Sequence, residues 1–337
     1  MTKARLPSLA MIMCVRDEED FIGANLAYHH TLGVSRAYIF NDSSEDSTVD
    51  IVRSFPWAKV IDAPADHSKP FGKHQNMCAD EALKMARKDG MDWLMYIDAD
   101  EFAFAEKTPF GILGRVFPPV KKLKRLSLLE RGNLRYMLKG IGSRKKQVIL
   151  ETKEVLPLAV PEDKPFWDLH YCHKRGLENR EVLDPLTGNM EPLPWFGQTM
   201  GKSIVRTSTD VQAAHAHRWT WNQDKPIPEV LPLPSEKKGV IYHFVSFNAG
   251  NWLRKFRKHS YFPEIYIRGG LIDFPKSSWK IASARMSDEE AKRYFMKWLA
   301  LSADEIKKYW ADGTVTRETV VEDILRESGW EEALSRK

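Results

Sequence analysis

Short apolar runs alternate with amphipathic segments through roughly the first hundred residues, and this alternation restricts the chain to few architectures. The apolar runs, each short enough for a buried strand, cover residues 8–15, 36–40, 58–62 and 92–98. The segments between them have helical spacing and cover residues 17–33, 47–55 and 73–90. Repeated strand–helix units predict a parallel sheet covered by helices on both faces, and therefore an α/β fold.

Three carboxylates directly follow the fourth apolar run, in the stretch "WLMYIDADEFAF". Asp98 and Asp100 would share one face of an extended chain, and neighbouring carboxylates repel unless a cation or a proton lies between them. Oxygen ligands suit Mg²⁺ or Mn²⁺, and ligands of parallel sheets bind beyond the carboxyl ends of the strands. The sequence therefore predicts a divalent-metal site here that could hold a diphosphate leaving group. An acidic turn or a helix cap is the structural alternative.

Polar clusters also follow the first and second apolar runs, at what would be the same edge of the sheet. Arg16, Asp17 and Glu18 follow the first run, and Asn41 and Asp42 follow the second. An arginine there could bind phosphate, and an acid could accept hydrogen bonds from a ribose or a base. Ordinary helix capping is the alternative. No G-x-G-x-x-G or G-x-x-x-x-G-K-[ST] stretch is present, which argues against a nicotinamide dehydrogenase and a P-loop enzyme.

Composition places the chain among water-soluble globular proteins. Of its 337 residues, 43% are hydrophobic and 29% are charged, and no apolar run approaches the ~20 residues of a membrane span. Three cysteines without metal-ligand spacing indicate a reducing, cytoplasmic compartment. The net charge of +5 and the basic clusters favour an anionic partner, such as a nucleotide diphosphate or a lipid headgroup. No nucleic-acid-binding motif accompanies them, so no nucleic-acid partner is expected.

The alternation becomes irregular after residue 105. A strand is predicted over residues 125–131, an exposed linker over 231–238, and mostly helix from about Ala249 onwards. We therefore expect a domain over 1–248, with a nucleotide-binding half (8–104) and an acceptor half (105–248), followed by a helical extension over 249–337. The basic, aromatic helix "NWLRKFRKH" fits peripheral contact with the inner, anionic face of a membrane. Packing of its apolar side on the protein is the favoured alternative.

Three of these stretches resemble a known family. "MIMCVRDEEDFIGANLAYHHTLGV", "YIFNDSSEDST" and "YIDADEF" are similar to GT-A fold glycosyltransferases of the family-2-like and family-92-like group, specifically over residues 9–104. Looser matches, "GKSIVR", "AAHAHRW" and "IYHFVSF", extend the resemblance to about residue 260, and Asp17 stands where the group often has Asn. The resemblance implies metal-dependent, inverting transfer of a sugar from a nucleotide-diphosphate sugar, foremost a UDP-sugar. The acceptor would be a hydroxyl of a glycan or lipid-linked glycan.

The resemblance also implies roles for particular residues. The main chain near Val15 and Arg16, with Glu18, would line the nucleotide pocket, and Asp42 would hold the uracil or ribose. Asp98 would contact the ribose or a metal-bound water, and Asp100 would bind the metal directly. The remaining implied residues are Lys73 and Gln75 near the diphosphate-sugar, and His217, or else His215, as a further metal ligand. The "HAH" spacing places both imidazoles on one face of a strand, and imidazole suits Mn²⁺ better than Mg²⁺.

An inverting transferase needs a base that takes the proton of the acceptor hydroxyl. Asp163, Asp168 and Glu191 lie in an irregular region rich in proline and tryptophan and are the candidates, with Asp168 preferred. Two other functions stay open. A nucleotidyl or phosphoryl transferase would use Asp98 and Asp100 for two metals, and a non-catalytic module would bind a nucleotide or sugar without turnover.

Overall fold

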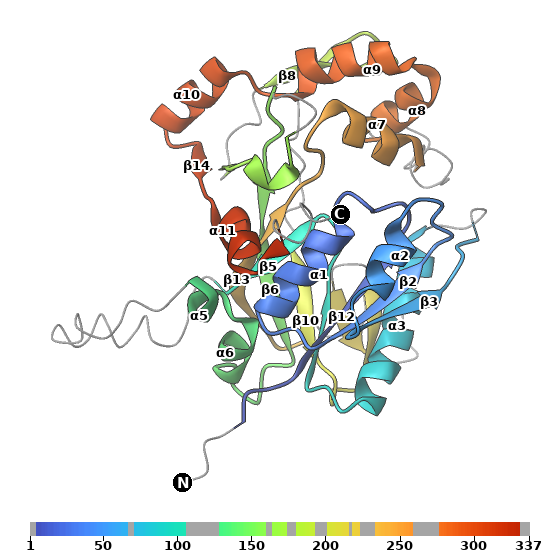
Figure 1. The fold of residues 1–337 in the computed structure, drawn as a ribbon, viewed down its shortest axis with the longest axis vertical. Helices are drawn as coiled ribbons and strands as arrows, with labels where there is room; N and C mark the ends of the chain where they lie inside the picture. The colour runs from blue at the N-terminus through green and yellow to red at the C-terminus, as the bar shows by residue number, and fades with distance from the viewer. Residues whose placement is uncertain are drawn as a thin grey trace, which may run out of the picture.

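The computed structural model describes residues 5–66, 71–105, 128–159, 164–173, 180–192, 201–215, 218–222, 233–258 and 276–330 (Figure 1). Its strands are β1 (Leu9–Val15), β2 (Arg36–Asn41), β3 (Ala58–Asp62), β4 (Trp93–Tyr96), β5 (Glu101–Phe104), β6 (Gln147–Val155), β7 (Tyr171–His173), β8 (Glu181–Leu183), β9 (Met190–Pro192), β10 (Lys202–Arg206), β11 (Val211–His215), β12 (Arg218–Trp221), β13 (Ser235–His243) and β14 (Val315–Arg317). Its helices are α1 (Ile22–Thr31), α2 (Thr48–Arg53), α3 (Phe71–Lys88), α5 (Leu128–Gly132), α6 (Leu134–Lys139), η2 (Phe166–Asp168), α7 (Ala249–Lys258), α8 (Lys276–Arg285), α9 (Asp288–Tyr294), η5 (Phe295–Leu299), α10 (Ala303–Ala311) and α11 (Val320–Glu327).

One large sheet organises the described part of the chain, in the order β14-β7-β6-β10-β4-β1-β2-β3, with β13 paired to β6 and β5 paired to β13. The strands β3, β2, β1 and β4 run parallel to one another. Strand β10 is antiparallel to both β4 and β6, so the run of neighbouring parallel strands ends at β4, which the acidic stretch follows. The predicted α/β fold class, with a parallel, Rossmann-like sheet and a helical segment at the C-terminal side, is confirmed. The half of the sheet beyond β4 is more mixed than predicted.

The core lies on both faces of this sheet, as the continuous apolar runs of the strands predict. Alternate residues of β1 face opposite sides: Met11 and Met13 pack with α1, α6 and α11, whereas Ala10 and Ile12 pack with α3 and the β11–β12 hairpin. Helices therefore cover both faces (Figure 1). The predicted inner side of α1 is buried, including Ile22, and the predicted inner side of α3 is buried around Ala82.

Helix α1 begins later than predicted. The expected helix includes Asp17 to Asp20, but the observed one starts at Ile22. The main-chain N–H groups of Asp17, Glu18 and Glu19 instead donate to side chains of the loop that follows β2. These acids therefore belong to a loop at the sheet edge, because cross-loop hydrogen bonds replace the first helical turn.

Two other predicted elements are wrong. Residues 128–131 of the strand predicted over 125–131 lie in helix α5, because the stretch is rich in leucine, arginine and glutamate and lacks β-branched residues. The predicted linker over 231–238 becomes strand β13 from Ser235 onwards. Its main chain is paired with β6, so polar side chains do not prevent the strand.

The C-terminal segment contributes a strand to the sheet and a helix to its core. Strand β14 pairs with β7, and Ile324 and Leu325 of α11 enter the core next to α1. Helices α7 to α10 lie above the sheet as drawn in Figure 1. The domain boundary at 248 stays a prediction, and the segment after it contains the strand β14 as well as helices.

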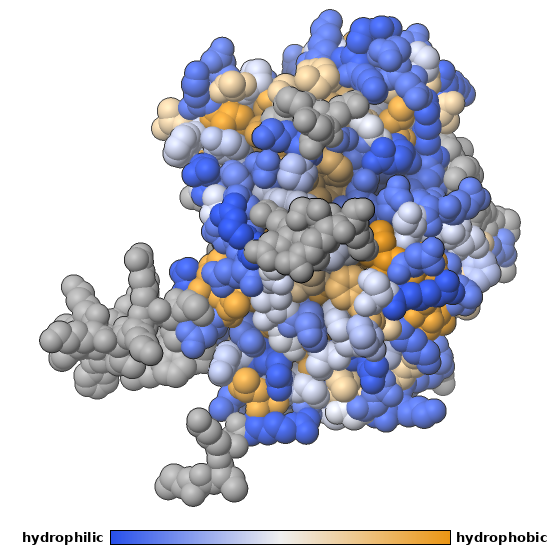
Figure 2. All heavy atoms as spheres, in the orientation of Figure 1, coloured by the Kyte–Doolittle hydropathy of each residue, from blue (hydrophilic) through white to orange (hydrophobic). Residues whose placement is uncertain are grey.

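The apolar side of α7 is covered by the protein itself. Trp252, Leu253 and Phe256 are buried in a cluster with α8, α9 and η5. On the face of the molecule in Figure 2, coloured residues are mainly hydrophilic and hydrophobic ones gather in small groups. The structure therefore favours the packing interpretation of this helix over insertion of its aromatic side into lipid.

Candidate active site

The acidic stretch forms a tight turn between β4 and β5. The Asp98 side chain is 31% exposed, whereas that of Asp100 is 8% exposed. Glu101 is completely buried, and its Oε2 accepts a hydrogen bond from the main-chain N–H of Asp98 at 2.9 Å. The turn therefore presents two aspartates at the carboxyl edge of the sheet, and the buried glutamate of the same turn stabilises it through a hydrogen bond to its main chain.

Helix α1 holds this turn in place through Asn25 and His29. Asn25 Nδ2 donates to the carbonyl oxygens of Ala99 at 2.9 Å and Glu101 at 2.7 Å. His29 Nδ1 lies 2.8 Å from Asn25 Oδ1, and its Nε2 accepts from the N–H of Ala103 at 3.0 Å. Burial lowers the pKa of His29 to about 4, so its ring is neutral at physiological pH. A buried, uncharged network thus fixes the backbone of the acidic turn.

Strand β10 brings a lysine to the same turn. Because β10 runs antiparallel to β4, its first residue, Lys202, lies beside the carboxyl end of β4. Lys202 Nζ donates to Asp98 Oδ2 at 2.5 Å and lies 3.3 Å from Glu101 Oε2. Burial lowers the pKa of Lys202, but Asp98 and Glu101 outweigh it and the pKa lies above its ordinary value. For the acid Glu101 burial has the opposite effect: it raises the pKa to about 7, although Lys202 opposes the shift.

The residue before Lys202 has to be a glycine. Gly201 has φ +63°, and a Cβ added there would lie 1.9 Å from the carbonyl oxygen of Leu150. At the "GKS" stretch, β10 and β6 therefore approach each other closely, and the next residue, Lys202, is buried.

Strand β13 places a histidine between two acids. His243 pairs with Glu101 of β5 on one side and with Glu154 of β6 on the other. His243 Nδ1 lies 2.8 Å from Glu154 Oε2, and Nε2 lies 3.6 Å from Asp100 Oδ2. Burial lowers the pKa of His243, but Glu154 and Asp100 outweigh it and raise the pKa to about 10. The histidine is therefore oriented by one carboxylate and faces the second.

Helix α7 supplies two further cations. Lys255 Nζ donates to Asp100 Oδ2, the oxygen that also faces His243. Burial raises the pKa of Asp100, but Lys255 and His243 outweigh it, and the pKa lies well below its ordinary value. Lys258 Nζ donates to Glu18 Oε1 at 2.6 Å and to the carbonyl oxygen of Arg16 at 2.6 Å. Each acid at this edge therefore has a cationic neighbour, as buried charges require.

The loops after β1 and β2 are locked together next to this cluster. Asp17 and Ser43 have left-handed φ values of 51° and 53°, which are strained for residues other than glycine. The N–H of Asp17 donates to Ser44 Oγ at 3.0 Å, and the N–H of Glu18 donates to Thr48 Oγ1 at 2.7 Å. The predicted polar clusters thus form one rigid rim.

Asp42 and Arg16 meet in this rim, as their positions after neighbouring strands predict. Arg16 Nη1 lies 3.9 Å from Asp42 Oδ2. Asp42 Oδ1 accepts from the N–H of Ala65 at 2.6 Å, and the N–H of Asp42 donates to the carbonyl of Val15 at 2.8 Å. The structure therefore brings Val15, Arg16 and Asp42 together, while their assignment to a nucleotide pocket stays a prediction.

The other predicted donor and metal residues lie on α3 and β11 or outside the described residues. Lys73 and Gln75 are in the first turn of α3, Lys73 exposed and Gln75 half-buried. His215 ends β11, where its main chain pairs with Arg218, and His217 lies outside the described residues. The role of each as a donor or metal ligand stays a prediction.

The three candidate bases are also untested. Asp168 ends η2, and its Oδ2 lies 3.7 Å from Lys164 Nζ. Glu191 is in β9, in a two-stranded sheet with β8 that is separate from the main sheet. Asp163 lies outside the described residues.

Sequence reasoning missed three residues of the cluster: His243, Lys202 and Lys255. His243 lies in "IYHFVSF" and Lys202 in "GKSIVR". Both stretches belong to the family resemblance, so the sequence did contain a signal that could have identified these two residues. Lys255 lies in a basic helix, where nothing in the sequence separates it from the neighbouring cations. Within the described ranges, no group of three or more His, Cys, Asp and Glu side chains is arranged to hold a metal ion.

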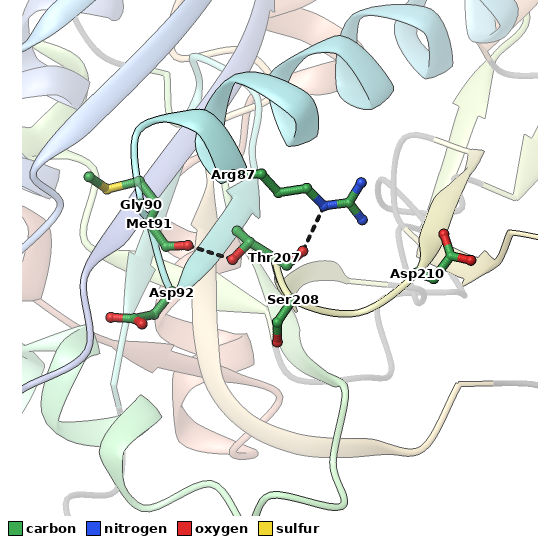
Figure 3. A pocket seen from close by; sticks show the side chains of 7 residues that line it. All are labelled: Arg87, Gly90, Met91, Asp92, Thr207, Ser208 and Asp210. Carbon is green, nitrogen blue, oxygen red and sulfur yellow. Dashed lines mark hydrogen bonds between the residues drawn. The ribbon is translucent and has the colours of Figure 1, made fainter.

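An open pocket lies at the opposite edge of the sheet (Figure 3). It has a volume of about 530 Å³ and lies between the end of α3 and the loop after β10. Arg87 Nε donates to the carbonyl of Thr207 at 2.8 Å and Nη2 to that of Thr209 at 2.7 Å, while the Thr207 hydroxyl donates to the carbonyl of Met91. The Arg87 guanidinium and the Thr207 hydroxyl of this pocket therefore bond to main-chain carbonyl groups.

Comparison with known proteins gives one curated relative. No protein-family model matches the chain. It is 22% identical over 309 residues to a glycosyltransferase-like protein of Arabidopsis thaliana, in a match covering 88% of this chain. The chain spans 62% of the length of that relative, less than two thirds. In sequence, this chain is therefore similar to a glycosyltransferase-like protein.

Similar solved structures are more distant. Mannosyl-3-phosphoglycerate synthase from Rubrobacter xylanophilus is 17% identical, with a TM-score of 0.29, over 60% of this chain and 54% of that one. Glucosyl-3-phosphoglycerate synthase from Mycobacterium tuberculosis, solved with Mn²⁺, UDP and glucosyl-3-phosphoglycerate, is 13% identical, with a TM-score of 0.25, over 60% and 57% of the chains. The roles of this chain's residues are therefore argued from its own geometry.

Among the described ranges, no helix combines the length and the apolar character needed to cross a bilayer.

Proposed function

We propose that this protein is a metal-dependent glycosyltransferase of the GT-A fold that uses a nucleotide-diphosphate sugar. One observation carries the proposal: Asp100 at the carboxyl end of β4 faces His243, whose other ring nitrogen is held by Glu154. The rim formed by Arg16 and Asp42 lies at the ends of the neighbouring strands β1 and β2, where a nucleotide is expected. The similarity to a glycosyltransferase-like protein supports the same class.

The residues present fit a divalent cation. A metal-ligating histidine usually donates its second ring N–H to a carboxylate, which is the relation between His243 and Glu154. Asp100 and His243 Nε2 would hold the ion, and the partly exposed Asp98 could bind its water or the ribose. Mn²⁺ suits this mixture of oxygen and imidazole ligands better than Mg²⁺. When bound, the ion would neutralise the diphosphate as it leaves.

The protein's own residues would then orient and deprotonate the reactants. Arg16 would meet the diphosphate, and Asp42 would accept hydrogen bonds from the base or ribose. Lys202 Nζ donates to Asp98 Oδ2 and Asn25 fixes the backbone of the acidic turn, so both aspartates are already oriented when the donor binds. A carboxylate, foremost Asp168, would take the acceptor's proton in a single, inverting displacement. We propose UDP as the nucleotide and a hydroxyl of a glycan or lipid-linked glycan as the acceptor.

Nucleotide binding tests the proposal. We would titrate UDP, GDP and dTDP calorimetrically into the wild-type protein and Asp100→Ala, each with and without Mn²⁺. The expected result is binding of UDP that requires Mn²⁺ and is lost in the variant. A folded wild-type protein that binds no nucleoside diphosphate with Mn²⁺ would reject the proposal.

A second measurement separates the enzyme from the alternatives. Release of UDP from a panel of UDP-sugars, with water as the acceptor, reports turnover without a known acceptor. Slow release by the wild type, absent in Asp100→Ala, supports a transferase. Binding without any release supports a silent binding module, and turnover of nucleoside triphosphates in its place supports a nucleotidyl transferase.

A further inference from the structure

Two lysines on α7 differ in how firmly they are held. Lys255 and Lys258 are three residues apart and therefore lie on one side of the helix. Lys258 Nζ has three acceptors: Glu18 Oε1 at 2.6 Å, the carbonyl of Arg16 at 2.6 Å and the carbonyl of Asp17 at 3.0 Å. Lys255 Nζ has one hydrogen-bond acceptor among the described residues, Asp100 Oδ2. Lys258 is therefore held in the rim by three hydrogen bonds, whereas Lys255 is held by one hydrogen bond, to Asp100.

That carboxylate is the same one that the metal would need. A small divalent cation such as Mg²⁺ binds a carboxylate oxygen directly, at roughly 2.0–2.1 Å. The Lys255 ammonium and His243 Nε2 both approach Asp100 Oδ2, so a metal ion between Asp100 and His243 would overlap the position of Lys255. The metal ion and the Lys255 ammonium cannot both occupy this position, because the two groups would overlap and their charges would repel at short range.

The Lys255 side chain is also accessible to solvent. Its side chain is 21% exposed, so it enters the cluster from the solvent side, unlike Lys202, whose side chain is completely buried. A lysine ammonium on a flexible four-carbon stem can change partners without movement of the helix. The helix itself is fixed by Trp252 and Phe256 in the core.

We propose that Lys255 is a tethered counter-ion that occupies the metal position when no donor is bound and moves to the diphosphate when the donor arrives. This inference rests on the proposed function and adds a residue to its donor site. Lys255 makes metal binding depend on the nucleotide, because Asp100 becomes available only when the diphosphate takes the lysine. The free protein therefore binds Mn²⁺ weakly, and UDP and Mn²⁺ bind together.

Calorimetric titration of Mn²⁺ into the nucleotide-free protein tests this inference. Lys255→Met is expected to bind Mn²⁺ at least about tenfold more tightly than the wild type, because the competing charge is gone. The same variant is expected to bind UDP at saturating Mn²⁺ at least about tenfold more weakly, because the diphosphate loses a cation. Arg254→Met is the matched control: Arg254 is a neighbouring α7 cation, 60% exposed and paired with Asp20, and its variant should match the wild type in both titrations.

Charge and fold are controlled by further variants. Lys255→Arg keeps the charge and should keep the weak Mn²⁺ binding of the wild type, whereas Lys255→Gln should behave as Lys255→Met does. The glutamine can still hydrogen-bond to Asp100, so it serves if the methionine variant does not fold, as judged by circular dichroism.

The two proposals fail in different ways. A wild type that binds UDP with Mn²⁺, but whose Mn²⁺ affinity without nucleotide does not rise in Lys255→Met or Lys255→Gln, overturns the role of Lys255 and leaves the transferase. An equal rise in Lys255→Arg overturns it too, because charge would then not matter. A wild type that binds no nucleoside diphosphate rejects the proposed function itself, and this inference with it.

Discussion

The two edges of the central sheet contrast in charge and in space. At the carboxyl edge, Asp98, Asp100 and Glu101 are buried or half-buried and balanced by cations from three separate elements. At the amino edge, a pocket of about 530 Å³ is open, but its arginine bonds to main-chain carbonyls. Buried charges are costly and persist only where they are compensated, whereas an open pocket with satisfied polar groups costs little. The contrast shows that a cluster of compensated buried charges locates the candidate site better than the volume of a pocket does.

The largest effect is expected for Asp100→Asn, which keeps the size of the side chain and removes its charge. Turnover of the UDP-sugar should fall by about 10³-fold or more, because the carboxylate would bind the cation on which the leaving diphosphate depends. The measurement is UDP release under saturating Mn²⁺. Retention of more than a tenth of the wild-type rate would remove Asp100 from the proposed site.

Lys202→Met should cause the largest loss of stability. It leaves Asp98 and Glu101 without their buried counter-ion, which costs about 3–5 kcal/mol of unfolding free energy. Lys84→Met is the control, since Lys84 is 69% exposed and its pair with Glu81 contributes at most about 1 kcal/mol. Urea denaturation measures both variants, and equal losses would mean that the Lys202 cluster does not behave as buried charge.

The neutral network below the acidic turn predicts a pH dependence. The folded-state pKa of His29 is lowered to about 4, below its ordinary value of 6.5, so the unfolded chain takes up the proton first. Its contribution to stability is therefore complete above pH 6.5 and falls as the pH drops from 6.5 to 4, by on the order of 3 kcal/mol. Denaturation at several pH values should show this slope in the wild type and a smaller one in His29→Gln. An identical slope in both would assign the acid sensitivity to other groups.

Glu154→Gln tests whether the carboxylate behind His243 matters for metal binding. With UDP present, Mn²⁺ affinity should fall by about 10- to 100-fold, because the histidine loses the partner that orients its ring. Glu151→Gln is the control, since Glu151 is on the same strand with its side chain 62% exposed. Unchanged affinity in Glu154→Gln would place the metal away from His243.

The smallest effect is expected at the amino edge. Ser208→Ala and Asp210→Asn alter the lining of the open pocket, and UDP binding and turnover should both match the wild type within about twofold. Calorimetry and UDP release provide the two readings. A clear loss of either would show that the two edges are functionally linked and would weaken the contrast.

Much of the first half of the fold could be predicted from the sequence. Strands and helices up to β4 follow local patterns, and a parallel sheet necessarily brings the ends of β1, β2 and β4 to one edge. Asp98, Asp100 and Asp42 could be placed there for that reason. The start of α1 could not, because side chains of the next loop compete for the same N–H groups.

The sequence by itself determined the α/β class and the position of the acidic turn, because both depend on short-range periodicity and strand ends. Only the tertiary structure decided which cations balance that turn. Lys202, His243 and Lys255 come from strands and a helix more than a hundred residues away, and their approach depends on strand order and on a glycine where two strands nearly touch. A charge pattern shows how many cations a chain carries, but the energy of a buried carboxylate depends on which of them the fold brings within reach.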